Sequence, residues 1–224
     1  MAEKYGTVPK RFTKAWWEWY WMYYKWLTLG ILFALMIITV SVVSSLTAEK
    51  YDITLTYAGE TYHTDLQKEK VEEILSPLCT DLDGNGESSL FFSSLYLDPE
   101  SNDVQQVQAS ATKLTMAIGE EETYLFLLTR EIADAYKEES AEYIPFAPLE
   151  DWAKGNISGL DTYDAHGNSY GIAISDLDIF KEMGIPTDDV YMFMRYYPRK
   201  DQIKKQLEGY KESIELANKI LAYK

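Results

Sequence analysis

Residues 123–128 read Thr-Tyr-Leu-Phe-Leu-Leu, an apolar run of the length of one strand. A strand that is apolar at successive positions is typical of a sheet covered on both faces, because its alternate side chains then enter two different cores. Helical patterns lie on either side of it, with apolar side chains on one stripe in residues 103–118 and a short helix expected over 131–137. This stretch therefore predicts an α/β fold.

The alternation of strands and helices continues upstream. We expect a β-branched strand at 53–57, a helix over 64–78 that Thr64 caps, and a second strand at 89–97. A strand–helix–strand–helix–strand order favours parallel strands joined by right-handed crossovers. The predicted fold class is thus α/β, a three-layer domain with a mostly parallel sheet.

The pattern is less regular downstream. Residues 143–159 hold several prolines and glycines and are expected to be irregular. A hairpin around 165–168, a short helix over 175–183 and a strand at 190–195 then follow.

A long helix is expected at the C-terminal end of the sequence, over residues 199–223. One face carries apolar residues at alternating spacings of four and three: Ile203, Leu207, Tyr210, Ile214, Ala217 and Leu221. Such a stripe usually packs on the sheet of its own domain. The alternative is a coiled-coil contact with a partner.

A second apolar run of a different kind lies near the N-terminus. Residues 26–46 contain no charged side chain, and a helix of this length covers about 30 Å, the thickness of a bilayer's hydrocarbon core. Five of the six tryptophans stand just before this run or at its start, and tryptophan prefers the headgroup layer. The predicted membrane-interface residues are Trp16, Trp17, Trp19, Trp21 and Trp26.

The charges around this run predict its orientation. Residues 1–25 carry five basic and two acidic side chains, whereas only Lys50 follows the span closely. The positive-inside rule then places the N-terminus in the cytoplasm. We expect a cytoplasmic and interfacial segment at 1–25, a transmembrane helix at 26–47 and an extracytoplasmic α/β domain at 48–224. A cleaved signal peptide, with Val43 and Ser45 at the cleavage site, is the alternative, but the apolar run is longer than such peptides usually have.

Composition excludes some classes of function. The part of the chain after residue 25 carries 16 basic and 34 acidic residues, which disfavours nucleic acid as a partner. No zinc-finger, Walker-type or dinucleotide-binding pattern is present. The one cysteine, Cys79, cannot form an internal disulfide, which fits a bacterial extracytoplasmic domain or a cytosolic one better than a eukaryotic secreted one.

One loop resembles half of a calcium site. Asp81, Asp83 and Asn85 stand at positions 1, 3 and 5, a glycine follows at position 6, and Glu87 supplies position 7. Position 12 is Phe92, which cannot bind calcium. A complete Ca²⁺ site would therefore need a ligand from elsewhere, such as Asp52 or Asp98. The alternative is a polar connection that uses Asn-Gly turn chemistry.

No catalytic group of residues stands out. His63 and His166 are the only histidines, and neither lies in a recognisable nucleophile–histidine–acid pattern. Asp161, Asp164 and His166 are close in sequence and could bind a metal ion, but a hairpin turn explains the same residues. We therefore expect a protein that is not an enzyme.

Four stretches together resemble a group of uncharacterised single-span membrane proteins of clostridial-type Gram-positive bacteria. They are Tyr23-Tyr-Lys-Trp26, the strand region 51–59, the Asp-Leu-Asp-Gly-Asn-Gly loop and Tyr124-Leu-Phe-Leu-Leu128. The resemblance implies a single-span topology and no assigned reaction. The order of elements from Ala58-Gly59 to Tyr124 is also similar to one lobe of an extracellular solute-binding protein.

Three functions follow as hypotheses. The first is a non-enzymatic, membrane-anchored accessory or interaction domain beside a membrane protein such as a transporter. The second is a reduced solute-binding domain that holds a small ligand at the carboxyl ends of its parallel strands, where Ala58, Gly59, Asp98 and Thr129 would line the crevice. The third is an extracellular hydrolase. The sequence leaves the oligomeric state open.

Overall fold

The computed structural model describes residues 9–47, 51–82, 84–119, 123–139, 144–155, 157–196 and 204–223. The chain divides into two compact units, Met1–Lys50 and Tyr51–Lys224. The described part of the first unit contains one helix, α1, and the second unit contains the sheet with its covering helices.

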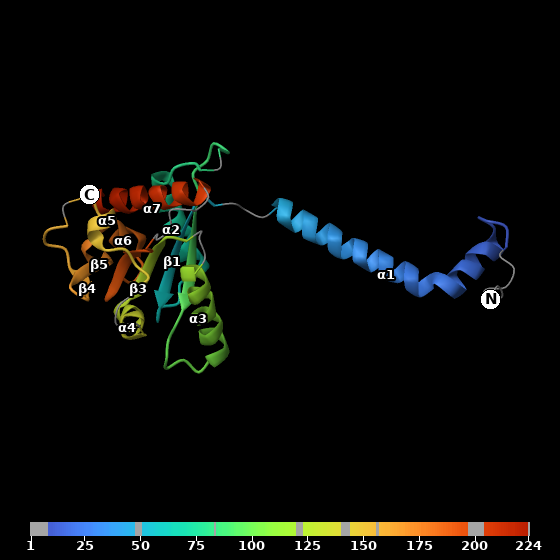
Figure 1. Ribbon diagram of the computed structural model, residues 1–224, viewed down its shortest axis with the longest axis horizontal. Coiled ribbons are helices and arrows are strands. Elements are labelled where there is room, and N and C mark those ends of the chain that lie inside the picture. The colour runs from blue at the N-terminus through green and yellow to red at the C-terminus, as the bar shows by residue number, and fades with distance from the viewer. Residues whose placement is uncertain are drawn as a thin grey trace. The chain divides into compact units, whose positions relative to one another are not determined.

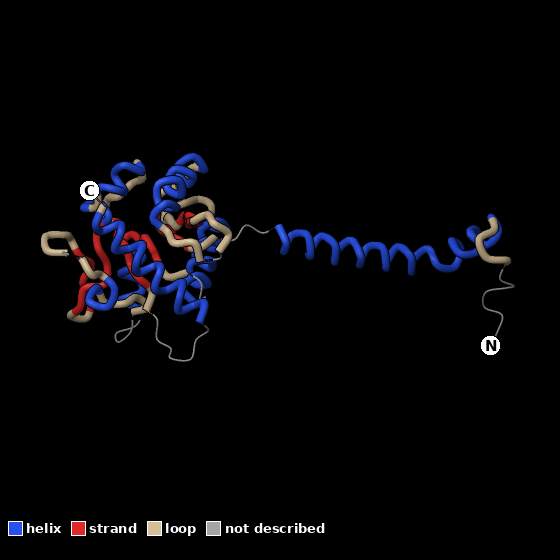
Figure 2. The backbone as a smooth tube through the Cα atoms, turned by 90° about the horizontal axis from the view of Figure 1, so that it is seen from above, coloured by secondary structure: helices blue, strands red, loops and turns tan. Residues whose placement is uncertain are grey.

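Helix α1 spans Lys14–Thr47, so the aromatic segment and the apolar run belong to one helix. Aromatic rings stack along its N-terminal part at intervals of four residues, with centroids 5.3 Å apart for Trp16 and Tyr20 and 5.4 Å apart for Tyr20 and Tyr24. Figures 1 and 2 show that the axis of α1 bends in its N-terminal third. The Tyr20 hydroxyl and the Thr28 Oγ1 share a hydrogen bond of 2.6 Å in this region.

The second unit is built on one six-stranded sheet with the strand order β2-β1-β3-β6-β5-β4. Its strands are β1 Ile53–Gly59, β2 Leu90–Tyr96, β3 Leu125–Thr129, β4 Thr162–Ala165, β5 Asn168–Ala173 and β6 Val190–Met194. β1 pairs in parallel with both β2 and β3, whereas the pairings β3–β6, β6–β5 and β5–β4 are antiparallel. The prediction of a mostly parallel sheet is therefore correct for one half of the sheet and wrong for the other.

The length of one connection accounts for the antiparallel pairing of β5 and β6. A parallel connection needs a crossover that carries the chain back along the sheet. Helices α2 (Asp65–Leu75) and α3 (Val104–Gly119) are long enough to do this between the parallel strands. Helix α6 (Asp178–Met183), which precedes β6, has only six residues and covers about 9 Å. The chain therefore enters β6 at the end of the sheet where β5 stops.

Helices cover both faces of the sheet, as the three-layer prediction requires. One core contains side chains from α2, α5 (Leu149–Trp152), α6 and α7 (Lys204–Ala222), and the other contains side chains from α3 and α4 (Arg130–Glu139). Short 3-10 turns lie at Ser76–Leu78 and Ile174–Asp176. Figure 2 shows the C-terminal helix crossing the strands.

Local signals define several element ends. Thr64 and Gln67 form a capping box at the start of α2. The β4–β5 hairpin turns through His166 and Gly167, whose φ angles of 49° and 84° fit the left-handed turn that two-residue hairpins favour. The expected irregular stretch at 143–159 contains the one-turn helix α5, whose Trp152 is fully buried.

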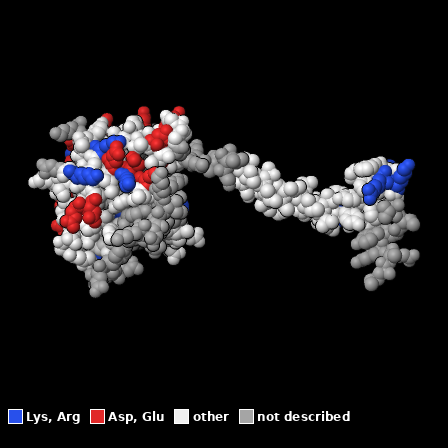
Figure 3. Space-filling model, turned by 45° about the horizontal axis from the view of Figure 1, so that its top comes forward, with Lys and Arg blue, Asp and Glu red and all other residues white. Residues whose placement is uncertain are grey.

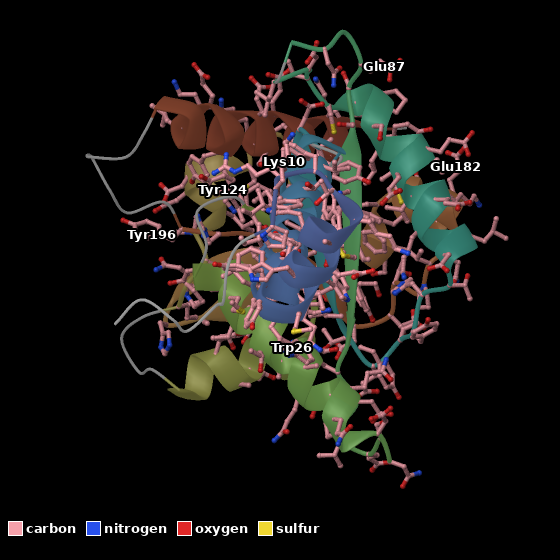
Figure 4. All side chains as sticks on the ribbon, turned by 90° about the vertical axis from the view of Figure 1, so that its right-hand side faces the viewer. Lys10, Trp26, Glu87, Tyr124, Glu182 and Tyr196 are labelled. Atoms are coloured by element: carbon pink, nitrogen blue, oxygen red, sulfur yellow. The ribbon has the colours of Figure 1, made fainter. Side chains whose placement is uncertain are left out.

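Helix α7 packs on its own domain. Its residues Leu216, Ala217 and Ile220 are buried in the first core, and Tyr210 lies edge-on to Tyr124, with ring centroids 5.4 Å apart. Figure 4 shows Tyr124 close to this helix. The predicted packing of the apolar stripe is therefore confirmed for Tyr210, Ile214, Ala217 and Leu221, whereas Leu207 is exposed by 38%. Ile203 lies outside the described residues.

Candidate functional site

The carboxyl end of the parallel half of the sheet is where α/β folds usually bind ligands. β1 is followed in the chain by β2 on one side and then β3 on the other, so the strand order reverses between β1 and β3. The register pairs Ala58 with Leu128, which places Gly59 next to Thr129. Asp98 follows β2 at the same end of the sheet, where the Leu97 N–H donates to the Gly59 carbonyl at 2.8 Å.

The space beside Gly59 is filled by protein atoms. A Cβ at this position would lie 2.5 Å from both the Thr129 methyl carbon and the Tyr57 hydroxyl oxygen, so only glycine fits. Ala58 is fully buried. Burial also raises the pKa of Tyr57, whose hydroxyl interacts with Thr61. A ligand at this edge would therefore have to bind outside the layer formed by Tyr57 and Thr129.

Outside this layer, carboxylates gather from all three parallel strands. We call Glu60, Asp98, Glu100 and Glu131 the acidic edge. The pKa of Glu60 is raised, first by its hydrogen bond with Glu131 and further by the negative charges of Glu131, Asp98 and Glu100. Asp98 also accepts hydrogen bonds from the Tyr96 hydroxyl at 2.7 Å and from the Glu100 N–H at 2.8 Å.

Three large apolar side chains are exposed on connections that leave the same end of the sheet. They are Tyr62 in the β1–α2 loop, Leu66 in the first turn of α2 and Val104 at the start of α3, exposed by 63%, 76% and 64%. Of the four carboxylates of the acidic edge, only Asp98 was predicted from the sequence, together with Ala58, Gly59 and Thr129 at the same strand ends. The carboxylates within a few residues of each parallel strand end are the signal that would have added Glu60, Glu100 and Glu131.

An arginine joins the parallel and antiparallel halves of the sheet at this end. Arg130 donates through Nε to Asp189 at 2.8 Å and through Nη2 to the Tyr191 hydroxyl, and Tyr191 in turn donates to Asp161 at 3.1 Å. The guanidinium also lies 4.8 Å from the centre of the Tyr191 ring. The hydrogen bond to Asp189 raises the pKa of Arg130 further. Because two carboxylates already balance its charge, Arg130 is poorly placed to bind an additional anion.

The calcium-like loop lies at the opposite end of β2. Both carboxylate oxygens of Asp81 accept backbone N–H groups, from Gly84 at 2.6 Å and from Gly86 at 2.8 Å. Asn85 accepts from the Glu87 N–H at 2.7 Å. Glu87 itself is exposed, and Figure 4 shows it on a loop at the periphery of the domain. Asp83 lies outside the described residues.

Of the two additional calcium ligands considered, Asp52 lies against this loop. Its carboxylate accepts the Leu82 N–H at 2.7 Å and the Ser89 N–H at 2.8 Å. Asp98 follows the other end of β2. Among the described residues, no three histidine, cysteine or acidic side chains are grouped so as to hold a metal ion. Calcium binding by Asp81, Asp83, Asn85 and Glu87 stays a prediction.

His63 is a buried core residue. Its Nδ1 shares a hydrogen bond of 2.9 Å with the Ser94 hydroxyl, and its ring packs edge-on against Tyr57 at 4.4 Å and Phe92 at 5.5 Å. Burial, together with the positive charge of Lys68, lowers the pKa of His63 to about 4. The imidazole is therefore neutral at pH 7, and these contacts hold it in the core.

The aromatic residues predicted at the membrane interface all lie on α1. Trp17, Trp21 and Trp26 are exposed, whereas Trp16 and Trp19 pack against neighbouring rings of the same helix. The segment Lys14–Val43 is long and apolar enough to cross a membrane, and none of its most apolar window is buried. Figure 3 shows Lys and Arg side chains gathered at the N-terminal end of this apolar stretch.

Comparisons with known proteins add no relative from which a function could be transferred. The sequence matches no protein-family model, and neither a curated protein nor a solved structure is significantly similar to it.

Proposed function

We propose that this protein is a single-pass membrane protein whose α/β domain is a non-enzymatic interaction module on the outer side of the cell membrane. The five basic residues before the apolar run and Lys50 after it support a cytoplasmic N-terminus. The partner we propose is a membrane protein, such as a transporter.

The observation that carries this proposal is the surface at the carboxyl end of the parallel strands. Exposed Tyr62, Leu66 and Val104 follow the parallel strands β1 and β2 at this end of the sheet, as the acidic edge also does, while the crevice beside Gly59 is filled. Apolar side chains contribute binding energy when they are covered, and the mutual repulsion of the carboxylates decreases when a positive charge approaches. A partner segment with basic and apolar side chains fits both features.

The alternative is a reduced solute-binding domain with a small ligand at this end of the sheet. The close packing of Tyr57, Gly59 and Thr129 gives it less support, because a small ligand is normally held in a concave site that buries most of its surface. A hydrolase has the least support, because His63 is buried in the core and, although its Nδ1 hydrogen-bonds the Ser94 hydroxyl, no carboxylate among the described residues hydrogen-bonds its Nε2.

The proposal can be tested by site-specific photo-crosslinking in native membranes. The crosslinker would be placed at Leu66, and at Lys211 on α7 as an exposed control position. We expect one membrane protein to be crosslinked from position 66 and not from position 211. The crosslink should weaken when Glu60, Glu100 and Glu131 are changed to lysine. Equal crosslinking from both positions, or no effect of the charge reversal, would contradict the proposed surface.

Orientation needs a separate measurement. Protease added outside intact cells should digest the α/β domain and leave the segment before α1 protected. Protection of the whole domain would contradict an extracytoplasmic location, whatever the crosslinking shows.

A further inference from the structure

β2 lies at one edge of the sheet, and among the described residues it has a strand neighbour, β1, on one side only. The Leu97 N–H donates to Gly59 of β1, so the odd-numbered residues of this segment direct their N–H groups toward β1. The even-numbered residues Leu90, Phe92, Ser94 and Tyr96 therefore direct theirs toward the outer edge. Unpaired edge amides are a template on which another strand can add.

Two of these outer amides are bonded by side chains of the segment that precedes β2. The Phe92 N–H donates to Glu72 Oε1 at 2.9 Å, and the Leu90 N–H donates to Ser76 Oγ at 3.1 Å. Glu72 belongs to α2, and Ser76 directly follows it. Both hydrogen bonds are partly buried.

The spacings of helix and strand match at this contact. Residues 72 and 76 are separated by about one turn, with a rise of roughly 6 Å, and alternate residues of a strand are about 6.6 Å apart. Two acceptors on one face of α2 can therefore meet two successive outer amides. Below them, Val71 and Leu75 are buried in the first core and hold the helix in place.

We propose that Glu72 and Ser76 form an edge lock, a pair of side chains that takes the place of a seventh strand and prevents β2 from pairing with β2 of a second copy. Phe91, on the same strand, is exposed by 39%, so an open edge would present apolar surface as well as amides. Pairing of open edges is favoured further for a chain held in a membrane, because confinement raises the effective concentration of neighbouring copies.

The test compares full-length variants in the same detergent. We expect Glu72→Ala combined with Ser76→Ala to self-associate as concentration rises in analytical ultracentrifugation. Glu73→Ala, a change at the adjacent exposed position, and Glu72→Gln, which keeps an acceptor oxygen, should both sediment like the wild type. Identical sedimentation of the double variant and the Glu73→Ala control would overturn the proposal.

A second measurement does not depend on the double variant's folding. Hydrogen exchange of the Phe92 amide should be slow in the wild type and in Glu72→Gln, and about fivefold or more faster in Glu72→Ala. Phe92 exchange at an unprotected rate in the wild type would show that the lock is absent.

Discussion

At the scale of single residues, His63 shows how burial changes the chemistry of a side chain. The pKa of its imidazole is lowered to about 4, first by burial and then by Lys68, against an ordinary value near 6.5. The unfolded chain therefore takes up a proton before the folded domain does as the pH falls. The contribution of the neutral histidine is complete above about pH 6.5, is lost between about pH 6.5 and 4, and does not decrease further below that.

This linkage gives a measurable difference between pH 7 and pH 5. Over this interval, His63 should reduce the free energy of unfolding by about 2 kcal/mol. His63→Phe removes the titrating group and keeps an aromatic ring against Tyr57 and Phe92, so its stability should fall less over the same interval. Urea unfolding of both proteins at the two pH values measures the difference. Equal losses would show that His63 is not held neutral by the fold.

At the scale of elements, helix α7 is joined to the loop after α5 by one asparagine. Asn218 donates through Nδ2 to the carbonyls of Trp152 at 2.8 Å and Ile214 at 2.7 Å, and its Oδ1 accepts the Lys154 N–H at 2.7 Å. The carbonyl and amide groups at the end of α5 thus obtain partners from a helix more than 60 residues away in the chain.

Replacing Asn218 should therefore cost more than a surface change on the same helix. We expect Asn218→Ala to lower the free energy of unfolding by about 1–3 kcal/mol, because polar groups around Trp152 lose their partners. Lys211→Ala, at an exposed position of α7, should change it by less than about 0.5 kcal/mol. Denaturant unfolding of the wild type and both variants measures the two changes in the free energy of unfolding. An Asn218→Ala protein as stable as the control would mean that water replaces these bonds.

Elements were easier to predict than the way they pair. The continuous apolar run at 123–128 and the helical spacings around it predicted β3 and the flanking helices α3 and α4 correctly. A strand that is buried on both faces needs apolar residues at successive positions, and this pattern can be read from the sequence. The direction of β6 depends on whether α6 is long enough to return the chain, which is a property of the three-dimensional path. The acidic edge was missed for a similar reason, since Glu60, Glu100 and Glu131 meet only through the parallel pairing.

At the scale of the whole molecule, the two units are stabilised by different environments. Both hydrophobic cores of the α/β domain are built from residues after position 52, and they cover the two faces of the sheet. The side chains in the most apolar window of α1 are not buried within the structure. The stability of the domain should therefore not depend on the helix, whereas α1 needs an apolar solvent such as a bilayer.

A protein that consists of residues 51–224 should for this reason fold without detergent. Its acidic surface favours solubility, and its thermal midpoint should lie within about 2 °C of that of the domain in the full-length protein, since a loss of 1 kcal/mol would shift it by about 2–4 °C. Circular dichroism melting of both proteins measures the two midpoints, and the isolated segment 9–47 should become helical only in lipid vesicles or detergent. A domain that aggregates or melts many degrees lower on its own would mean that residues before Tyr51 contribute to its core, contrary to the division of the chain into two self-contained units.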